Sequence, residues 1–190
     1  GSEMCIRDRI HDPESGAVFV NKRNAIHYEN MSIALAESVA NQGQGFISSM
    51  AFGNGGTSVD PTGIITYLTP NSTGTNASLY NQTFTKIVDD RSVSNLDPQR
   101  NKIETRHVNG TNYTDVVVTC LLDYGEPNGQ DATDTASASD SLYVFDELGL
   151  VSYASSGTGK LLTHVIFHPV QKSLNRLIPV SYTHLRAHET

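Results

Sequence analysis

The sequence predicts a mainly β fold, an antiparallel β-sandwich or barrel-like domain with one N-terminal helix packed on it. Hydrophobic residues make up 37% and charged residues 17% of the 190-residue chain, which is low for a globular protein. Ser, Thr, Asn, Asp and Gly take their place, and this mixture favours turns and short strands over long helices. Only one segment has helical periodicity, and a series of short apolar segments bounded by turn residues follows it.

The helix is expected at residues 24–42. Apolar residues recur there at helical spacing, and a stripe this wide normally packs against a sheet. The stripe consists of Tyr28, Met31, Leu35 and Val39, widened by Ile26, Ile33, Ala36 and Ala40. Asn41 and Gly43 supply the signal that ends the helix.

Strands and turns alternate after the helix. Residues 45–52 predict a strand, and the glycines of the turn at 53–57 are expected to adopt positive φ. Further strands are expected at 64–68, which Pro70 closes, and at 85–90.

The clearest hairpin joins residues 102–108 to residues 113–122. The first arm alternates strictly, Asn109-Gly110 is typical of a tight hairpin turn, and the second arm is rich in β-branched residues. The face of the second arm expected in the core consists of Val116, Val118, Cys120 and Leu122.

The last strands are expected at 142–150 and 161–168, and Pro169 is expected to end the second of them. A final strand begins near Arg176. The acidic low-complexity segment 131–141 predicts a loop that buries nothing.

Both ends of the chain resemble translated sequencing adapter. Residues 1–9 can be encoded by one strand of a DNA segment whose reverse complement encodes residues 180–187. Such a pair is typical of a reading frame assembled from metagenomic DNA. We therefore expect residues 1–9 and 180–190 to be adapter artefacts. Residues 10–179 are expected to form a single β-rich domain, a fragment without its native ends.

Charge and hydropathy exclude two classes of partner. Thirteen Lys and Arg face 20 Asp and Glu, and the formal charge of −7 argues against binding to nucleic acid or to anionic lipid. No apolar run reaches the roughly 18 residues that a membrane-spanning helix needs. We expect neither a nucleic-acid nor a membrane partner.

Two patterns suggest ligand chemistry but lack essential parts. The segment SSGTGK at 155–160 resembles a phosphate-binding loop, yet Ala154 stands at the first glycine position, Leu161 replaces the hydroxyl, and a strand follows. His164 and His168 share a strand face, but no third ligand is near them, so a structural role is expected, as for His107. No cofactor and no metal site are expected.

Carboxylates occur in clusters, but a glycosidase would place them in a cleft lined with aromatic residues, and the chain has no Trp. We expect solvated acids, and the segment 131–141 lacks the spacing of a known calcium loop. Cys120 is expected to be a buried apolar residue rather than a nucleophile. No catalytic residue is therefore assigned. The clustered acids are Asp89, Asp90, Asp123, Glu126, Asp131, Asp134, Asp140, Asp146 and Glu147.

Two stretches resemble structural proteins of tailed bacteriophages. They are FDELGL at 145–150 and GKLLTHVIFHPVQK at 159–172, and the segment MAFGNGGT at 50–57 resembles the glycine-rich strand and turn near the front of such domains. The resemblance implies a virion component of tail, neck, fibre-adaptor or capsid-surface type, assembled in the bacterial host cytoplasm. In such a subunit, Glu147 is expected to bond backbone at a tight turn.

The expected function is that of a non-enzymatic virion subunit, in the first place one associated with the tail, neck or fibre. Its expected partners are copies of itself and other virion proteins. The alternative is a carbohydrate-binding or adhesin β-sandwich module with a surface glycan as partner. A sugar platform would need exposed aromatic residues beside paired polar groups. The candidates for it are Tyr67, Tyr80, Tyr113 and Tyr153.

Overall fold

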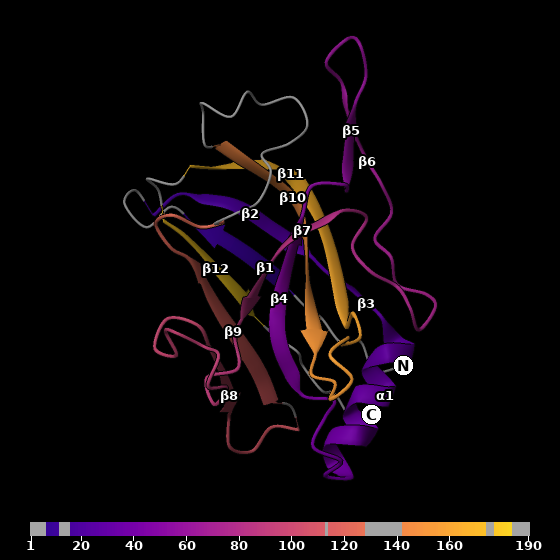
Figure 1. Cartoon of the computed structure of the whole chain (residues 1–190), viewed down its shortest axis with the longest axis vertical. Helices are drawn as coiled ribbons and strands as arrows, with labels where there is room; N and C mark the ends of the chain where they lie inside the picture. The colour runs from indigo at the N-terminus through magenta and orange to yellow at the C-terminus, as the bar shows by residue number, and fades with distance from the viewer. Residues whose placement is uncertain (1–6, 12–15, 113, 128–141, 174–176, 184–190) are drawn as a thin grey trace.

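Two five-stranded antiparallel sheets pack face to face in the computed structural model, and one helix lies at the end of the pair (Figure 1). Strands hold 47% of the residues and the helix 8%, which confirms the mainly β, sandwich-like fold. In the described part of the chain the sheets stay separate and do not close into a barrel. The structure describes residues 7–11, 16–112, 114–127, 142–173 and 177–183.

The first sheet has the order β2-β1-β12-β9-β8 and the second the order β3-β11-β10-β4-β7. The strands of the first sheet are β2 (Val18–Arg23), β1 (Arg7–His11), β12 (Ile178–Thr183), β9 (Thr114–Leu122) and β8 (Lys102–His107). Those of the second are β3 (Ala25–Ile26), β11 (Thr163–Ser173), β10 (Leu142–Ser152), β4 (Ile47–Gly53) and β7 (Gln82–Ile87).

A separate two-stranded hairpin projects from the body of the molecule (Figure 1). It consists of β5 (Thr57–Val59) and β6 (Ile65–Tyr67), and we call it the arm. Asp60 caps its turn, because one carboxylate oxygen accepts hydrogen bonds from the backbone nitrogens of Thr62 and Ile64 at 2.8 and 2.9 Å. Exposed apolar side chains on and beside the arm are Val59, Ile64, Tyr67 and Leu68.

The main hydrophobic core lies between the two sheets. Such a core stabilises the fold by roughly 25 cal/mol for each Å² of apolar surface removed from water. Its largest members from the second sheet are Met50, Phe52, Phe145, Leu148, Leu150 and Phe167. The first sheet contributes Ile10, Val20, Val118, Cys120, Leu122, Ile178 and Val180.

The predicted hairpin is confirmed. β8 pairs with β9 from Lys102 opposite Thr119 to His107 opposite Thr114, and Gly110 in the turn has φ +84°. Val118, Cys120 and Leu122 are buried, and Val116 packs against them. Local sequence was sufficient here because turn chemistry and strand alternation indicate the same register.

The expected end of the last long strand at Pro169 is wrong. β11 continues to Ser173, and its pairing with β10 shifts between Phe145 opposite Val170 and Glu147 opposite Ile166. Between these two pairs β11 has three residues where β10 has one. This irregularity takes Pro169, which has no N–H to donate, out of the hydrogen-bonded ladder.

The helix α1 (Tyr28–Val39) is shorter than expected and turned differently. It begins later because residues 25–26 pair with β11, and the Nδ1 atom of His27 accepts a hydrogen bond from the backbone nitrogen of Asn30 at 3.1 Å. Its buried residues are Asn30, Met31 and Ala34. Within the described residues, no helix is long and apolar enough to cross a membrane.

The predicted packing of the apolar stripe is therefore wrong for three of its four principal members. Tyr28 is 60%, Leu35 49% and Val39 86% exposed. The side-chain nitrogen of Asn30 donates to the carbonyl of Leu161 at 2.9 Å, so the side of the helix that carries Asn30, Met31 and Ala34 faces the rest of the domain. We call Tyr28, Leu35 and Val39 the outer stripe of α1.

The segments assigned to adapter enter the first sheet. Arg7 pairs with Thr183 and Ile10 with Val180, so β1 and β12 each contain residues on both sides of the expected boundaries. Strand membership depends on the residues present and not on their origin. The assignment of residues 1–9 and 180–190 to adapter stays a prediction.

The edge strand β8 carries a row of alternating charges. The Nζ atom of Lys102 lies 3.1 Å from a carboxylate oxygen of Glu104, and a guanidinium nitrogen of Arg106 lies 3.3 Å from the other. Both cations lower the pKa of Glu104, whose side chain stays near solvent. On the opposite side of the strand, Ile103 packs against the core.

Candidate functional site

Asp146 and Glu147, adjacent on the central strand β10, are both buried, so the expectation of solvated acids is wrong for this pair. Phe145 and Leu148 both belong to the core between the sheets although they are three positions apart. The residues between them, Asp146 and Glu147, therefore both lie away from that core, beside the irregular pairing with β11. They are 2% and 0% exposed.

Glu147 bonds to both ends of the segment between β4 and β7, an excursion of the chain that contains the arm. One oxygen accepts from the backbone nitrogens of Gly55 at 3.0 Å and Asn81 at 2.8 Å. The other accepts from the backbone nitrogen of Tyr80 and from the Nε2 atom of His164, both at 2.9 Å. Glu147 thus bonds backbone, as expected, and its three backbone partners come from two segments that are far apart in the sequence.

His164 completes this network as a neutral ring. Its Nδ1 atom accepts a hydrogen bond from the backbone nitrogen of Asn71 at 2.8 Å, so its proton resides on Nε2 and is donated to Glu147. Burial alone would raise the pKa of Glu147, but the bonds from His164, Asn81, Tyr80 and Gly55 outweigh it and lower the pKa. The pair is a carboxylate and a neutral imidazole.

Asp146 holds the start of the arm. Its two oxygens accept from the backbone nitrogens of Gly56 and Thr57, each at 2.9 Å, and the second also accepts the Thr57 hydroxyl. Here burial dominates, and the pKa of Asp146 is raised despite these bonds. Asp146 and Glu147 together form what we call the arm anchor.

The glycines at 53–57 serve the arm anchor and not a positive-φ turn, so that expectation is wrong. Gly53, Gly55 and Gly56 are absent from the positive-φ residues of the described chain. A Cβ atom on Gly53 would lie 2.5 Å from a Glu147 oxygen, and one on Gly56 would lie 2.9 Å from the Ile166 side chain. Glycine is needed because of close approach.

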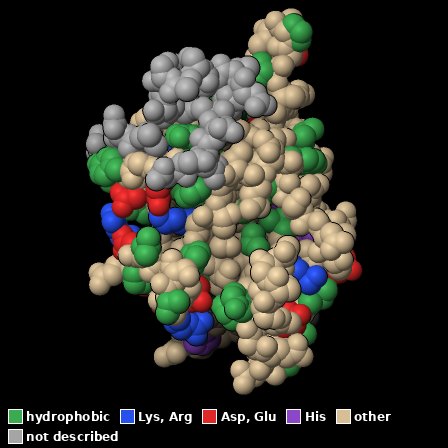
Figure 2. Space-filling view, viewed as in Figure 1, with side chains coloured by type: hydrophobic (Ala, Val, Ile, Leu, Met, Phe, Trp, Pro, Cys, Tyr) green, Lys and Arg blue, Asp and Glu red, His purple; other side chains and the backbone are tan. Residues whose placement is uncertain are grey.

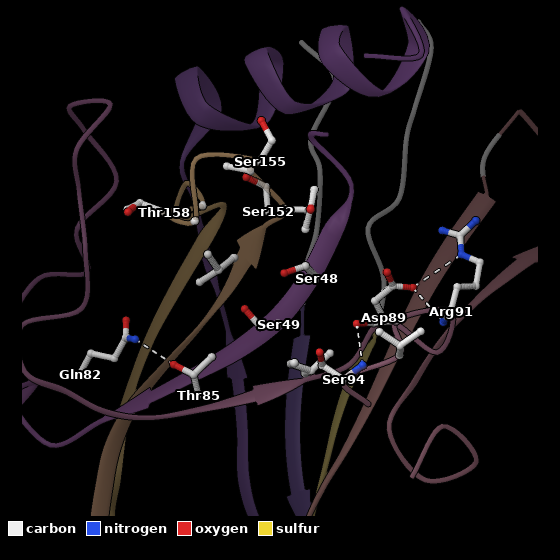
Figure 3. Close-up of a pocket in the computed structure, with 18 residues that line it drawn as sticks. Ser48, Ser49, Gln82, Thr85, Asp89, Arg91, Ser94, Ser152, Ser155 and Thr158 are labelled. Carbon is white, nitrogen blue, oxygen red and sulfur yellow. Dashed lines mark hydrogen bonds and ion pairs between the residues drawn. The ribbon is translucent and has the colours of Figure 1, made fainter. Parts of the chain in front are cut away.

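A polar trough of about 790 Å³ lies on the outer face of the second sheet (Figure 3). Its floor is formed by β7, β4 and β10, where Ile87, Ser49 and Val151 lie in one row across the strands. Residues 152–159 form one wall and residues 89–94 the other. This volume falls within the usual range for ligand sites.

The structure separates the residues that the sequence suggested as chemical pairs. His164 is bound within the network of the arm anchor, whereas His168 is exposed and its Nδ1 atom lies 3.3 Å from the Tyr67 hydroxyl. His107 contacts the Thr114 hydroxyl at 3.0 Å. In the described ranges, no three His, Cys, Asp or Glu side chains gather in a metal-binding cluster.

Cys120 is confirmed as a buried core residue. Burial raises the pKa of the Cys120 thiol to about 12. The charge of Lys86 lowers this pKa and the charge of Glu126 raises it, both by smaller amounts. The thiol is therefore protonated at neutral pH and unsuited to nucleophilic attack.

The other acids have local partners. A carboxylate oxygen of Glu126 lies 2.5 Å from the Nζ atom of Lys86, and its other oxygen accepts from the backbone nitrogen of Asp123 at 2.9 Å. Asp89 pairs with Arg91 at 3.6 Å and lines the trough. Asp131, Asp134 and Asp140, with the calcium expectation for 131–141, lie outside the described residues, as does Tyr113.

The segment 155–160 has a different role from phosphate binding. A bridge at Leu161 and then β11 follow it, and Ser155, Gly157, Thr158 and Gly159 line the trough. Sequence reasoning missed the trough because its Ser and Thr residues come from four separate segments without common spacing. The sequence signal that pointed towards it was Tyr153, which lies on one wall.

No protein-family model, no curated protein and no solved structure matches the chain.

Proposed function

We propose that the chain is a non-enzymatic structural subunit of a tailed-bacteriophage virion, tail-, neck- or fibre-associated, which assembles with copies of itself. The observation that carries the proposal is the outer stripe of α1. Tyr28, Leu35 and Val39 repeat at helical spacing, yet they face solvent in the single chain. A patterned apolar face without an internal partner is typical of a protein interface.

The arm supplies a second apolar surface for such an assembly. Hydrophobic side chains appear on its projecting tip (Figure 2), and Asp146 and Glu147 hold its base to the central strand. The arm and α1 lie towards opposite ends of the long axis of the molecule (Figure 1). Contact between the arm of one copy and the outer stripe of the next is a heterologous interface, which generates rings or helical tubes.

The resemblance to bacteriophage structural proteins supports the choice of particle. The two stretches that carry it fall on β10 and β11, which are adjacent in the second sheet. The glycine-rich stretch covers the end of β4 and the residues that donate hydrogen bonds to the arm anchor. On this proposal the protein is a virion component assembled in the host cytoplasm, and other virion proteins are further partners.

The assembly proposal is tested by size-exclusion chromatography with light scattering over a concentration series of the full chain. We expect a mass that rises with concentration. We expect Leu35→Lys with Val39→Lys, and separately Ile64→Lys, to return the protein to a monomer. Gln99→Lys on an exposed loop adds one positive charge, as Ile64→Lys does, and is the matched control for that variant, so it should assemble normally. A wild-type chain that stays monomeric up to its solubility limit would refute the proposal.

A further inference from the structure

The trough has the floor of a binding site for an extended ligand. Ser49 lies between Ile87 and Val151 in one row, and Thr85 follows on β7. These side chains face away from the core because Met50 and Phe52, their neighbours on β4, belong to it. The floor is therefore partly apolar and lies on the outer face of the sheet, with Thr85 exposed on it.

Hydroxyl and amide groups surround this floor. Figure 3 shows Ser152, Ser155 and Thr158 on one side of it and Asp89, Arg91 and Ser94 on the other, with Ser48 and Ser49 between them. Each hydroxyl both donates and accepts hydrogen bonds, as sugar hydroxyls do. The Gln82 amide adds further donors and an acceptor, and its nitrogen donates to the Thr85 hydroxyl at 2.9 Å.

An aromatic ring with a fixed orientation lines one wall. Tyr153 stacks on Phe46 with ring centroids 5.0 Å apart and planes 8° from parallel. One ring face is thus covered, while 42% of the residue stays exposed and lines the trough. A rigid aromatic surface beside polar groups provides apolar contact for the C–H face of a sugar ring.

The charge of the trough favours a neutral ligand. The residues that line it include one anion, Asp89, and one cation, Arg91. The two neutralise each other, because their side chains lie 3.6 Å apart and Asp89 also accepts from the Arg91 backbone nitrogen at 3.1 Å. No excess of positive charge is present in the lining to recognise a phosphate or a carboxylate.

The trough adjoins two smaller hollows, with which it shares lining residues. It shares Asp89 and Arg91 with a hollow of about 360 Å³ beside the end of α1. It shares Gln82 and Thr158 with a hollow of about 240 Å³ beside residues 75–78. This elongated shape fits a chain of linked units better than a single small molecule.

We propose that the trough binds a neutral oligosaccharide chain, which lies across β7, β4 and β10 with one sugar ring against Tyr153. The site is independent of the assembly interface, because none of its lining residues belongs to the outer stripe of α1 or to the arm. Failure of assembly and failure of sugar binding therefore give different results.

The experiment is calorimetric titration with neutral oligosaccharides built from glucose, galactose, mannose or N-acetylglucosamine, beside anionic galacturonate oligomers. We expect at least one neutral series to bind, with affinity that rises from disaccharide to hexasaccharide. Thr85→Trp fills the floor from an exposed position and should weaken binding at least tenfold. Tyr153→Ala should weaken it by a similar factor.

Thr105→Trp is the matched control, since Thr105 is exposed on the edge strand β8 of the other sheet. It should bind like the wild type, and thermal denaturation should show that both tryptophan variants are folded. The proposal is overturned if no neutral oligosaccharide binds, if galacturonate binds better, or if Thr85→Trp leaves the affinity unchanged.

Discussion

At the scale of single residues, the most consequential side chain is Glu147. It accepts four hydrogen bonds while fully buried, and three of them come from backbone on both ends of the excursion that carries the arm. A glutamine at this position would turn an amide group towards backbone donors that need an acceptor. A buried donor left without its acceptor typically costs about 1–3 kcal/mol, and hydrogen bonds to a charged group lie towards the upper end of that range.

We therefore expect Glu147→Gln to lower the free energy of unfolding by about 3 kcal/mol at neutral pH. Because the pKa of Glu147 is lowered in the folded protein, its stabilisation is complete above the ordinary value of 4.5 and is lost as the pH falls through the folded value. Urea denaturation from pH 7 to acid should show a steeper acid decline for the wild type than for the variant.

Asp146 acts in the opposite direction in this experiment. Its raised pKa means that protonation of Asp146 favours the folded state as the pH falls. Burial, the main cause of the raised pKa, acts in both proteins, whereas the smaller contribution from the Glu147 charge is lost in the variant and slightly reduces the expected difference between the acid limbs. Glu29→Gln, on the exposed first turn of α1, is the control, with an expected change within about 0.5 kcal/mol. Parallel acid limbs for wild type and Glu147→Gln would contradict the assigned role.

At the scale of elements, the helix shows what periodicity predicts and what it leaves open. The spacing of apolar residues located α1 to within four residues at its N-terminus. It did not determine which side faces the sheet, because that depends on Asn30 and its bond to a carbonyl 131 positions away. The hairpin of β8 and β9 was predictable because its two strands and its turn are close together in the sequence.

The orientation of α1 leads to a stability prediction at low protein concentration, where chains are separate. Val39→Glu should leave the free energy of unfolding within about 0.5 kcal/mol of the wild type, because Val39 faces solvent. Ala34→Glu should cost several times as much, because Ala34 is buried and a charge there has no room and no partner.

Chemical denaturation followed by circular dichroism measures both variants. The opposite order, with Val39→Glu the more damaging, would mean that the outer stripe packs against the sheet as the sequence alone suggested.

The candidate site was predictable only in part, because the residues that form it are far apart in the sequence. Glu147 stands in a recognisable strand, but its partners Gly55, Tyr80 and Asn81 lie more than 60 positions away. The glycines at 53–57 were interpreted as a positive-φ turn, because close backbone approach and positive φ both require glycine and cannot be told apart in a sequence. The two reasons separate only when the neighbouring atoms are known.

At the scale of the whole molecule, both ends of the chain meet in the first sheet. Val180 is fully buried and pairs with Ile10 on one side and Cys120 on the other. One residue attributed to adapter therefore completes the core between the sheets.

We expect Val180→Ala to lower the free energy of unfolding by roughly 2 kcal/mol, through lost burial and the cavity left behind. Arg9→Ala, on the neighbouring strand β1 but exposed, should change it by less than about 0.5 kcal/mol. Thermal or urea denaturation of the two variants provides the comparison. Equal, small effects would show that β12 adds little to the core.

The charged edge of β8 has a consequence for how copies meet. An unpaired strand edge exposes N–H and C=O groups that can template the strand of another chain. On β8 the close pairs of Lys102 with Glu104 and of Arg106 with Glu104 would have to lose water for such a strand to settle beside them. The charged side chains therefore disfavour the addition of further strands to this edge. We expect that β8 does not nucleate amyloid fibrils even in concentrated solutions of the protein.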